Sequence, residues 1–366
     1  MCMMKKSVLA LLVAASVSAS AQNVTKLAAT KANDYGVAYS LPQTTVKIIL
    51  HARKTVRTPG VFYNYSERYL GPEAARQAIA KASTQWELTG AELFAGAEIP
   101  AGAEQYLMQF KGGQPVFVAL AETGNPLTVN SDNVPAMPKT PTVPDDTPLT
   151  KTPLDDPAAR YAVTEDMLQG SSLAKRAGFA ADQIIQLRQS RQDYLTGQAD
   201  QMPDGQALTL ILQNIQAQEE ALTAMFLGTT QTATTSICIT YVPQASMPAA
   251  DVVIARLNAT DGFVDADDLS GAPVYLNSSV IAKGKLPLDE KGREKAFPKG
   301  GVPYSIPGSA RFAVDFDGRT VAAETFDVTQ LGVVFGLDPS FFTNKKEPGY
   351  AIFNPLTGGL REVGTK

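Results

Sequence analysis

The chain is poor in the residues on which many functional sites depend: its 366 residues include one His, one Trp and two Cys. A single His cannot supply the usual His ligands of zinc, and two Cys cannot hold together a small disulfide-rich fold. The formal net charge is −4, so the chain lacks the excess of basic residues that is typical of a nucleic-acid-binding protein. We therefore expect no metal, no cofactor, no catalytic residues and no nucleic-acid partner.

Long hydrophobic runs are also missing after the first 21 residues. Lys5 and Lys6 precede a short apolar run at 8–15, and Ala19-Ser20-Ala21 has the pattern of a cleavage site. Residues 1–21 are therefore predicted to be a signal peptide, and the protein to be exported to the periplasm, the outer membrane or the cell surface. No later stretch reaches the length of a membrane span, so we expect no transmembrane segment in the mature chain.

Removal of such a signal peptide would leave the chain with still fewer basic residues and cysteines. The mature chain would carry 30 basic and 36 acidic residues, a net charge of −6, and one cysteine, Cys238. Cys238 lies in the apolar stretch Ile237-Cys238-Ile239, which is typical of a strand, and nothing cationic beside it would activate its thiol. We expect a small buried side chain and no internal disulfide.

Proline is concentrated in one segment. Residues 131–160 hold seven of the 24 prolines, together with many Thr and Asp and no aromatic residue. Such a composition cannot bury enough apolar surface to form a core, so it predicts an extended linker or a strap across the surface. The prediction is an α+β, mainly β fold with two sandwich-like β-rich modules, residues 22–130 and residues 161–366.

The second module begins with two helical patterns, 181–196 and 205–226. Gly197 is a helix stop, Asp204 is a candidate N-cap, and the short connection predicts an antiparallel helical hairpin. Arg188 and Glu219 both lie close to the apolar stripes, where an unpaired charge is costly. The helical register predicts an Arg188–Glu219 ion pair, while Arg191 is expected to find its partner in the adjoining β region. The alternative is that Arg188, Arg191 and Tyr194 bind an anion.

An aromatic cluster precedes the first helical segment. It contains Phe62, Tyr63, Tyr65 and Tyr69. Packing in a core is the plainer interpretation, and recognition of a ligand or partner is the alternative. Together with Arg191 and Tyr194, these four residues form the candidate recognition patch.

Several blocks resemble a family of exported proteins of unknown function that is common in Bacteroidota and has about this length. They are 39–42, 59–63 with 69–71, 187–197 with 204–205, 219–228, 330–332 and 354–358. The resemblance implies a location in the cell envelope and supplies no catalytic residues.

The leading hypothesis is thus a non-catalytic cell-envelope protein, a binding or scaffold component associated with outer-membrane complexes, with other envelope proteins or glycan as partners. One alternative is a hydrolase acting on glycan or peptide, with carboxylates from the acidic segment 261–268. Another is a pilus-like surface subunit that pairs through exposed strand edges.

Overall fold

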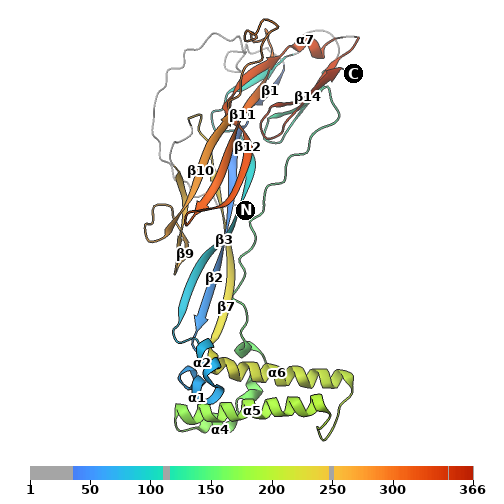
Figure 1. The fold of residues 1–366 in the computed structure, drawn as a ribbon. Coiled ribbons are helices and arrows are strands. Elements are labelled where there is room, and N and C mark those ends of the chain that lie inside the picture. The colour runs from blue at the N-terminus through green and yellow to red at the C-terminus, as the bar shows by residue number, and fades with distance from the viewer. Residues whose placement is uncertain (1–35, 110–115, 247–250, 345, 366) are drawn as a thin grey trace.

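A computed structural model describes residues 36–109, 116–246, 251–344 and 346–365. The molecule is elongated: long antiparallel strands run along its axis, and two long helices lie across one end (Figure 1). This mainly β architecture with a few helices confirms the predicted fold class. The predicted signal peptide lies outside the described residues.

The elements follow one another in a β, α, β order. The strands are β1 (Val37–Ser40), β2 (Gln43–Thr58), β3 (Ser83–Glu98), β4 (Gln105–Met108), β5 (Val118–Leu120), β6 (Pro126–Val129), β7 (Thr229–Tyr241), β8 (Val252–Asn258), β9 (Gly262–Val264), β10 (Ala272–Ala282), β11 (Val302–Phe316), β12 (Arg319–Leu337), β13 (Gly349–Phe353) and β14 (Leu360–Thr365). The helices are α1 (Ser66–Leu70), α2 (Pro72–Gln77), α3 (Ala159–Ala162), α4 (Glu165–Gln169), α5 (Leu173–Thr196), α6 (Gly205–Leu227) and α7 (Pro339–Phe342), with short 3-10 turns η2 (Tyr63–Tyr65) and η3 (Pro153–Asp155).

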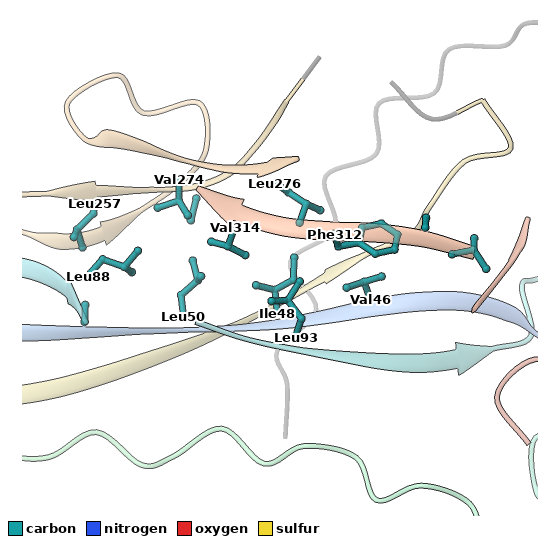
Figure 2. Close-up of a cluster of buried hydrophobic side chains, with 14 of the residues drawn as sticks. Val46, Ile48, Leu50, Leu88, Leu93, Leu257, Val274, Leu276, Phe312 and Val314 are labelled. Carbon is teal, nitrogen blue, oxygen red and sulfur yellow. The ribbon is translucent and has the colours of Figure 1, made fainter. Parts of the chain in front are cut away.

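The middle of the molecule is a β-sandwich. One sheet has the strand order β3-β2-β7 and the other β12-β11-β10-β8-β9, and all neighbouring strands are antiparallel. Alternate residues of β2, among them Ile48 and Leu50, face Val274, Phe312 and Val314 of the opposite sheet (Figure 2). These side chains are almost completely buried, as expected for the period of two in a strand with one face in a core.

The end of the molecule far from the helices has its own apolar core. The sheet β14-β13-β6-β5 and the pair β1-β4 pack there around one end of β11 and β12. Tyr39 is buried in this core beside Tyr106, and its hydroxyl donates to the carbonyl of Pro303 at 2.8 Å. Burial raises the pKa of Tyr39 well above its usual value.

The division into a module before and a module after the proline-rich segment does not describe how the strands pair. β2 lies between β3 and β7, so strands from both sides of residues 131–160 share one sheet and one core. The prediction failed because composition marks a segment without a core but carries no information about which distant strands pair.

The proline-rich segment itself is extended and lies along β7. The backbone N–H groups of Thr147 and Thr150 donate to carbonyls of β7 at 2.9 Å, and the Thr147 and Thr150 hydroxyl oxygens accept N–H groups of the same strand. Asp146 accepts in turn from Ser236 N at 3.3 Å. The segment is therefore a strap that covers the outer edge of β7, whose N–H and C=O groups would otherwise be unpaired.

The two helices of the hairpin have boundaries close to the predicted ones, except at the start of α5. Gly197 ends α5 in the left-handed conformation, and α6 begins after Asp204. The helix α5 begins earlier than its apolar pattern indicates because the hydroxyl of Ser172 caps it by accepting from Lys175 N. A tight turn at Asp317-Gly318 connects β11 and β12, with positive φ at both residues.

Candidate functional site

We call the helical end of the molecule, α1 to α6, the foot. Its core contains Phe62, Ile184, Leu222 and Phe226, together with buried alanines of α5. Tyr65, Tyr69 and Tyr194 pack on this core and are half-buried. The foot thus has its own, largely helical core, the third of the molecule, which the sandwich does not share.

Most of the predicted aromatic patch belongs to this core. The rings of Phe62 and Phe226 are 5.3 Å apart, and those of Tyr69 and Phe226 are 6.4 Å apart. Tyr69 also donates its hydroxyl to the carbonyl of Ala174 at 3.3 Å, and Tyr63 remains half-buried. Core packing, the plainer of the two interpretations, therefore describes Phe62 and Tyr69.

Hydrogen bonds join the end of α6 to the segment that connects β2 with β3. Phe62 N donates to the carbonyl of Met225 at 2.7 Å, and Ile79 N donates to the carbonyl of Leu227 at 2.8 Å. Ser66 donates its hydroxyl to the carbonyl of Phe226 at 3.0 Å. The carbonyl groups at the end of α6 are thus satisfied by the segment that follows β2, which ties the helical hairpin to the α1–α2 region.

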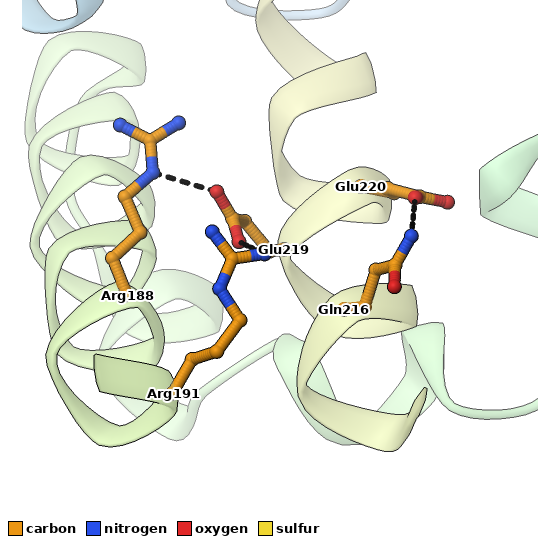
Figure 3. Close-up of polar contacts among 5 residues, drawn as sticks. All are labelled: Arg188, Arg191, Gln216, Glu219 and Glu220. Atoms are coloured by element: carbon orange, nitrogen blue, oxygen red, sulfur yellow. Dashed lines mark hydrogen bonds and ion pairs between the residues drawn. The ribbon is translucent and has the colours of Figure 1, made fainter. Parts of the chain in front are cut away.

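The ion pair predicted from the helical register is present. Arg188 Nε donates to Glu219 Oε1 at 2.6 Å across the hairpin (Figure 3). The Glu219 side chain is only 12% exposed, whereas that of Arg188 is 52% exposed. The carboxylate is therefore the buried partner, and the guanidinium reaches it from the surface.

The prediction for Arg191 is wrong. Its Nη1 lies 3.1 Å from Glu219 Oε2, not in the β region, although this contact lacks the angles of a hydrogen bond. Helical side chains lean toward the N-terminus of their own helix, which in an antiparallel pair brings both arginines and Glu219 toward the same level. The prediction from the helical register did not take this lean into account.

Two guanidinium groups therefore share one carboxylate. In Figure 3 both Nη atoms of Arg188 point away from Glu219. Arg191 is 39% exposed, and half-buried Tyr194 is one helical turn further along α5. The cluster has one positive charge in excess, and its free donors face outward, as the binding of an acidic group requires.

Replacing Arg188 with Met tests the structural part of this cluster. We expect a loss of about 0.5–1 kcal/mol, because Arg188 is half exposed and Arg191 still neutralises Glu219. Thermal melting would show a midpoint lower by roughly 2 °C. The Arg76→Met variant is the matched control, since the Arg76–Glu73 pair is almost fully exposed. Equal melting of the two variants would rule out a structural role for Arg188.

Apolar side chains are exposed on the hairpin. Leu195 is 63% exposed and Leu210 60% exposed, and Met202 in the connecting loop is 50% exposed. All three lie toward the free end of the hairpin, away from the strands (Figure 1). Single exposed apolar residues are ordinary, but several at one end beside a surplus positive charge form a surface suited to a protein partner.

A groove of about 740 Å³ opens where β8, β10 and the β11–β12 turn meet β3. Its aromatic walls are Trp86, Tyr275 and Phe316, and Asp251 and Asp315 add carboxylates. Sequence reasoning did not select these residues. The one available signal was the lone Trp, because strands far apart in the chain bring the others together.

A comparison with family models identifies the chain. Residues 35–361 match the model described as Domain of unknown function (DUF4831). The chain belongs to the DUF4831 family. The resemblance noted from the sequence is thereby confirmed for the family, whereas an origin in Bacteroidota stays a prediction. No curated protein and no solved structure matches the chain.

In this DUF4831 member, the block from 187 to 228 that carries the resemblance is the helical hairpin with its ion cluster and its junction to the strands. None of the helices formed by described residues is long and apolar enough to span a membrane. Within the same described ranges, no three His, Cys, Asp or Glu side chains gather as a metal site would need.

The acidic segment 261–268, the source of carboxylates in the hydrolase hypothesis, forms β9 and the turn after it. Asp268 accepts from Ser270 N at 2.9 Å. This backbone bond, together with one from the Ser270 hydroxyl, lowers the pKa of Asp268. A carboxylate held ionised in a turn has the role of an Asx cap, which requires no substrate.

Proposed function

We propose that this protein is a non-catalytic binding or scaffold component of the cell envelope, associated with outer-membrane complexes, and that the foot holds another envelope protein. The observation that carries the proposal is the exposed apolar end of the hairpin, with Leu195, Met202 and Leu210, beside the surplus charge of Arg188 and Arg191. Export is supported by the signal-peptide pattern of residues 1–21.

The chemistry of the foot defines the partner surface that would fit it. Leu195, Met202 and Leu210 supply apolar area, which is the main source of affinity in protein association. The outward donors of Arg188 and Arg191 favour an Asp or Glu at the edge of that surface and disfavour a basic one. The partner is therefore expected to present an apolar patch flanked by a carboxylate.

The rest of the structure suits a scaffold. The two long strands β11 and β12 run from the core far from the foot into the sandwich, and β2 continues from the sandwich toward the foot. A rigid sheet of this kind holds the two ends of the molecule apart at a constant distance. The foot can thus contact one partner while the opposite end stays free for another.

The test is cross-linking in intact cells, followed by mild detergent extraction and mass spectrometry of proteins bound to the tagged full-length chain. We expect envelope proteins to be recovered with the unchanged chain. The double variant Leu195→Glu/Leu210→Glu should lose at least about tenfold in recovery, because a charge in an apolar contact costs more than the 1.4 kcal/mol of one decade.

Leu269→Glu is the matched control, since Leu269 is exposed in the loop between β9 and β10, outside the foot. It should leave recovery unchanged. The same thermal midpoint in all three proteins would establish that they are folded. Undiminished recovery with the double variant, or a fully soluble chain with no bound protein, would contradict the proposal.

A further inference from the structure

We propose that the groove between β3, β8, β10 and the β11–β12 turn binds an organic cation, a ligand that carries a primary amine or a guanidinium. No role is assigned to this groove by the family or by the proposed function of the foot. Its volume of about 740 Å³ is within the range of small-molecule sites.

The walls of the groove are held in place by both sheets of the sandwich. Trp86 of β3 donates its indole N–H to the carbonyl of Thr260 at 3.0 Å, and the Lys54 ammonium lies 5.6 Å from the centre of its ring. Gly262 packs so closely against the indole that a side chain at this position would collide with it. The position of Trp86 is therefore defined by its neighbours before any ligand enters.

Tyr275 lies in the middle of the carboxylate-bearing wall. It is opposite Asp315 of β11 in the strand register and opposite Val253 of β8. The Asp315 carboxylate accepts from the Thr320 hydroxyl at 2.6 Å, and Asp251 accepts from the Asn277 amide at 2.7 Å. Both carboxylates are thus oriented by neutral donors, which leave their charge uncompensated.

The charge of the groove is one-sided. Asp251, Asp315 and Asp317 line it, and none of the described lining residues is Lys, Arg or His. Three cationic groups lie near it: Lys54 lies over Trp86, the Arg256 guanidinium donates to the carbonyls of Ala266 and Gly271, and Arg319, between lining residues Gly318 and Thr320, is exposed. The carboxylates therefore attract a cation and repel an anion.

The combination of carboxylates and aromatic rings selects among ligands. An amine or guanidinium gains charge-assisted hydrogen bonds to Asp251 and Asp315, and its cation is attracted to the ring of Tyr275. The hydroxyl groups of a neutral sugar could also donate to the carboxylates, but they would leave the negative charge of the carboxylates without a counterion. An organic cation is thus the ligand that uses both features of the groove.

The single tryptophan of the chain makes the groove directly observable. Trp86 is the only Trp, so its fluorescence reports on this site alone. We would titrate the full-length protein with spermidine and with a tetralysine peptide at low ionic strength. We expect a saturable change in Trp86 emission that weakens as salt is added.

Two variants test the carboxylates. Asp315→Asn and Asp251→Asn should each weaken binding of the cations about tenfold, because each removes a charge-assisted bond. Asp132→Asn is the matched control, since it removes the same charge from the exposed extended segment, and it should bind as the unchanged protein does. Equal midpoints in thermal melting would show that the variants are folded.

The relative affinities for spermidine and tetralysine show whether the cation is a free small molecule or part of a partner protein. Tighter binding of spermidine identifies a free polyamine as the kind of ligand, and tighter binding of tetralysine identifies basic side chains of a partner. The absence of a saturable change, equal or tighter binding of maltotriose, or unaltered affinity in both Asp variants would each overturn the proposal. The Leu195→Glu/Leu210→Glu protein should bind the cations normally, so failure at the foot and failure at the groove are distinguishable.

Discussion

Replacing Gly228 with Ala is expected to destabilise the protein by about 2–5 kcal/mol, because the new side chain meets both backbone strain and a collision. Gly228 follows α6 with φ 88° and ψ −176°, a conformation that is essentially restricted to glycine. A Cβ there would overlap the carbonyl oxygen of Thr58 and lie 3.1 Å from Gly60 N. Denaturation in urea, followed by circular dichroism, would measure the loss.

Gly197→Ala separates the two contributions. Gly197 also has a positive φ, 73°, but nothing lies within 4 Å of the position its Cβ would take. This variant should lose only the cost of a left-handed alanine, about 1–2 kcal/mol. If Gly228→Ala lowered the free energy of unfolding no more than Gly197→Ala does, the close approach of the foot to the strands would not be a determinant of stability.

The second large effect is expected in the sandwich core, where Phe312→Ala should cost about 3–5 kcal/mol. Phe312 is completely buried, and its ring is 6.3 Å from that of Tyr241 and 6.1 Å from that of Phe326. Truncation leaves a cavity between the two sheets. Guanidinium denaturation, followed by Trp86 fluorescence and circular dichroism, would quantify the loss.

Phe117→Ala makes the same chemical change at a position that is 76% exposed, and it should change stability by less than about 0.5 kcal/mol. The denaturation of Phe312→Ala also tests the shared core of the sandwich. Since strands from both sides of the proline-rich strap contribute to this core, the two probes should report the same midpoint. Separate midpoints, or a loss no greater than that of Phe117→Ala, would contradict the packing described here.

The foot and the groove are different kinds of surface. The foot presents apolar side chains and the surplus positive charge of Arg188 and Arg191, whereas the groove presents aromatic walls and the negative charge of Asp251, Asp315 and Asp317. Surfaces of opposite sign attract different partners, so one elongated chain can bind two ligands at the same time. This arrangement is consistent with a scaffold and gives each surface its own test.

Local features of the fold were predictable. The period of apolar residues, together with Gly197 and Asp204, placed the helical hairpin. Helices and turns depend on residues a few positions apart, which the sequence displays directly. The Arg188–Glu219 pair was also within reach, since it follows from two helical stripes and one short loop.

The candidate sites were less accessible to sequence reasoning. Phe62 and Tyr69 pack in the core of the foot, as the plainer interpretation expected; the recognition alternative stayed open because an aromatic cluster looks the same in the sequence whether a helix covers it or not. Arg191 was assigned to another region because the lean of helical side chains was not considered. The groove combines Trp86 with residues more than 160 positions away, so no local pattern could indicate it.

The sequence by itself thus determined the helical hairpin, the mainly β class, the signal-peptide pattern and the unsuitability of residues 131–160 for a core. Tertiary structure alone decided that β2 pairs with both β3 and β7, that Thr147 and Thr150 cover the edge of β7, and that two arginines share Glu219. The reason is physical: local conformation follows from neighbouring residues, whereas strand pairing, edge protection and charge sharing are set by competition among contacts distant in the chain.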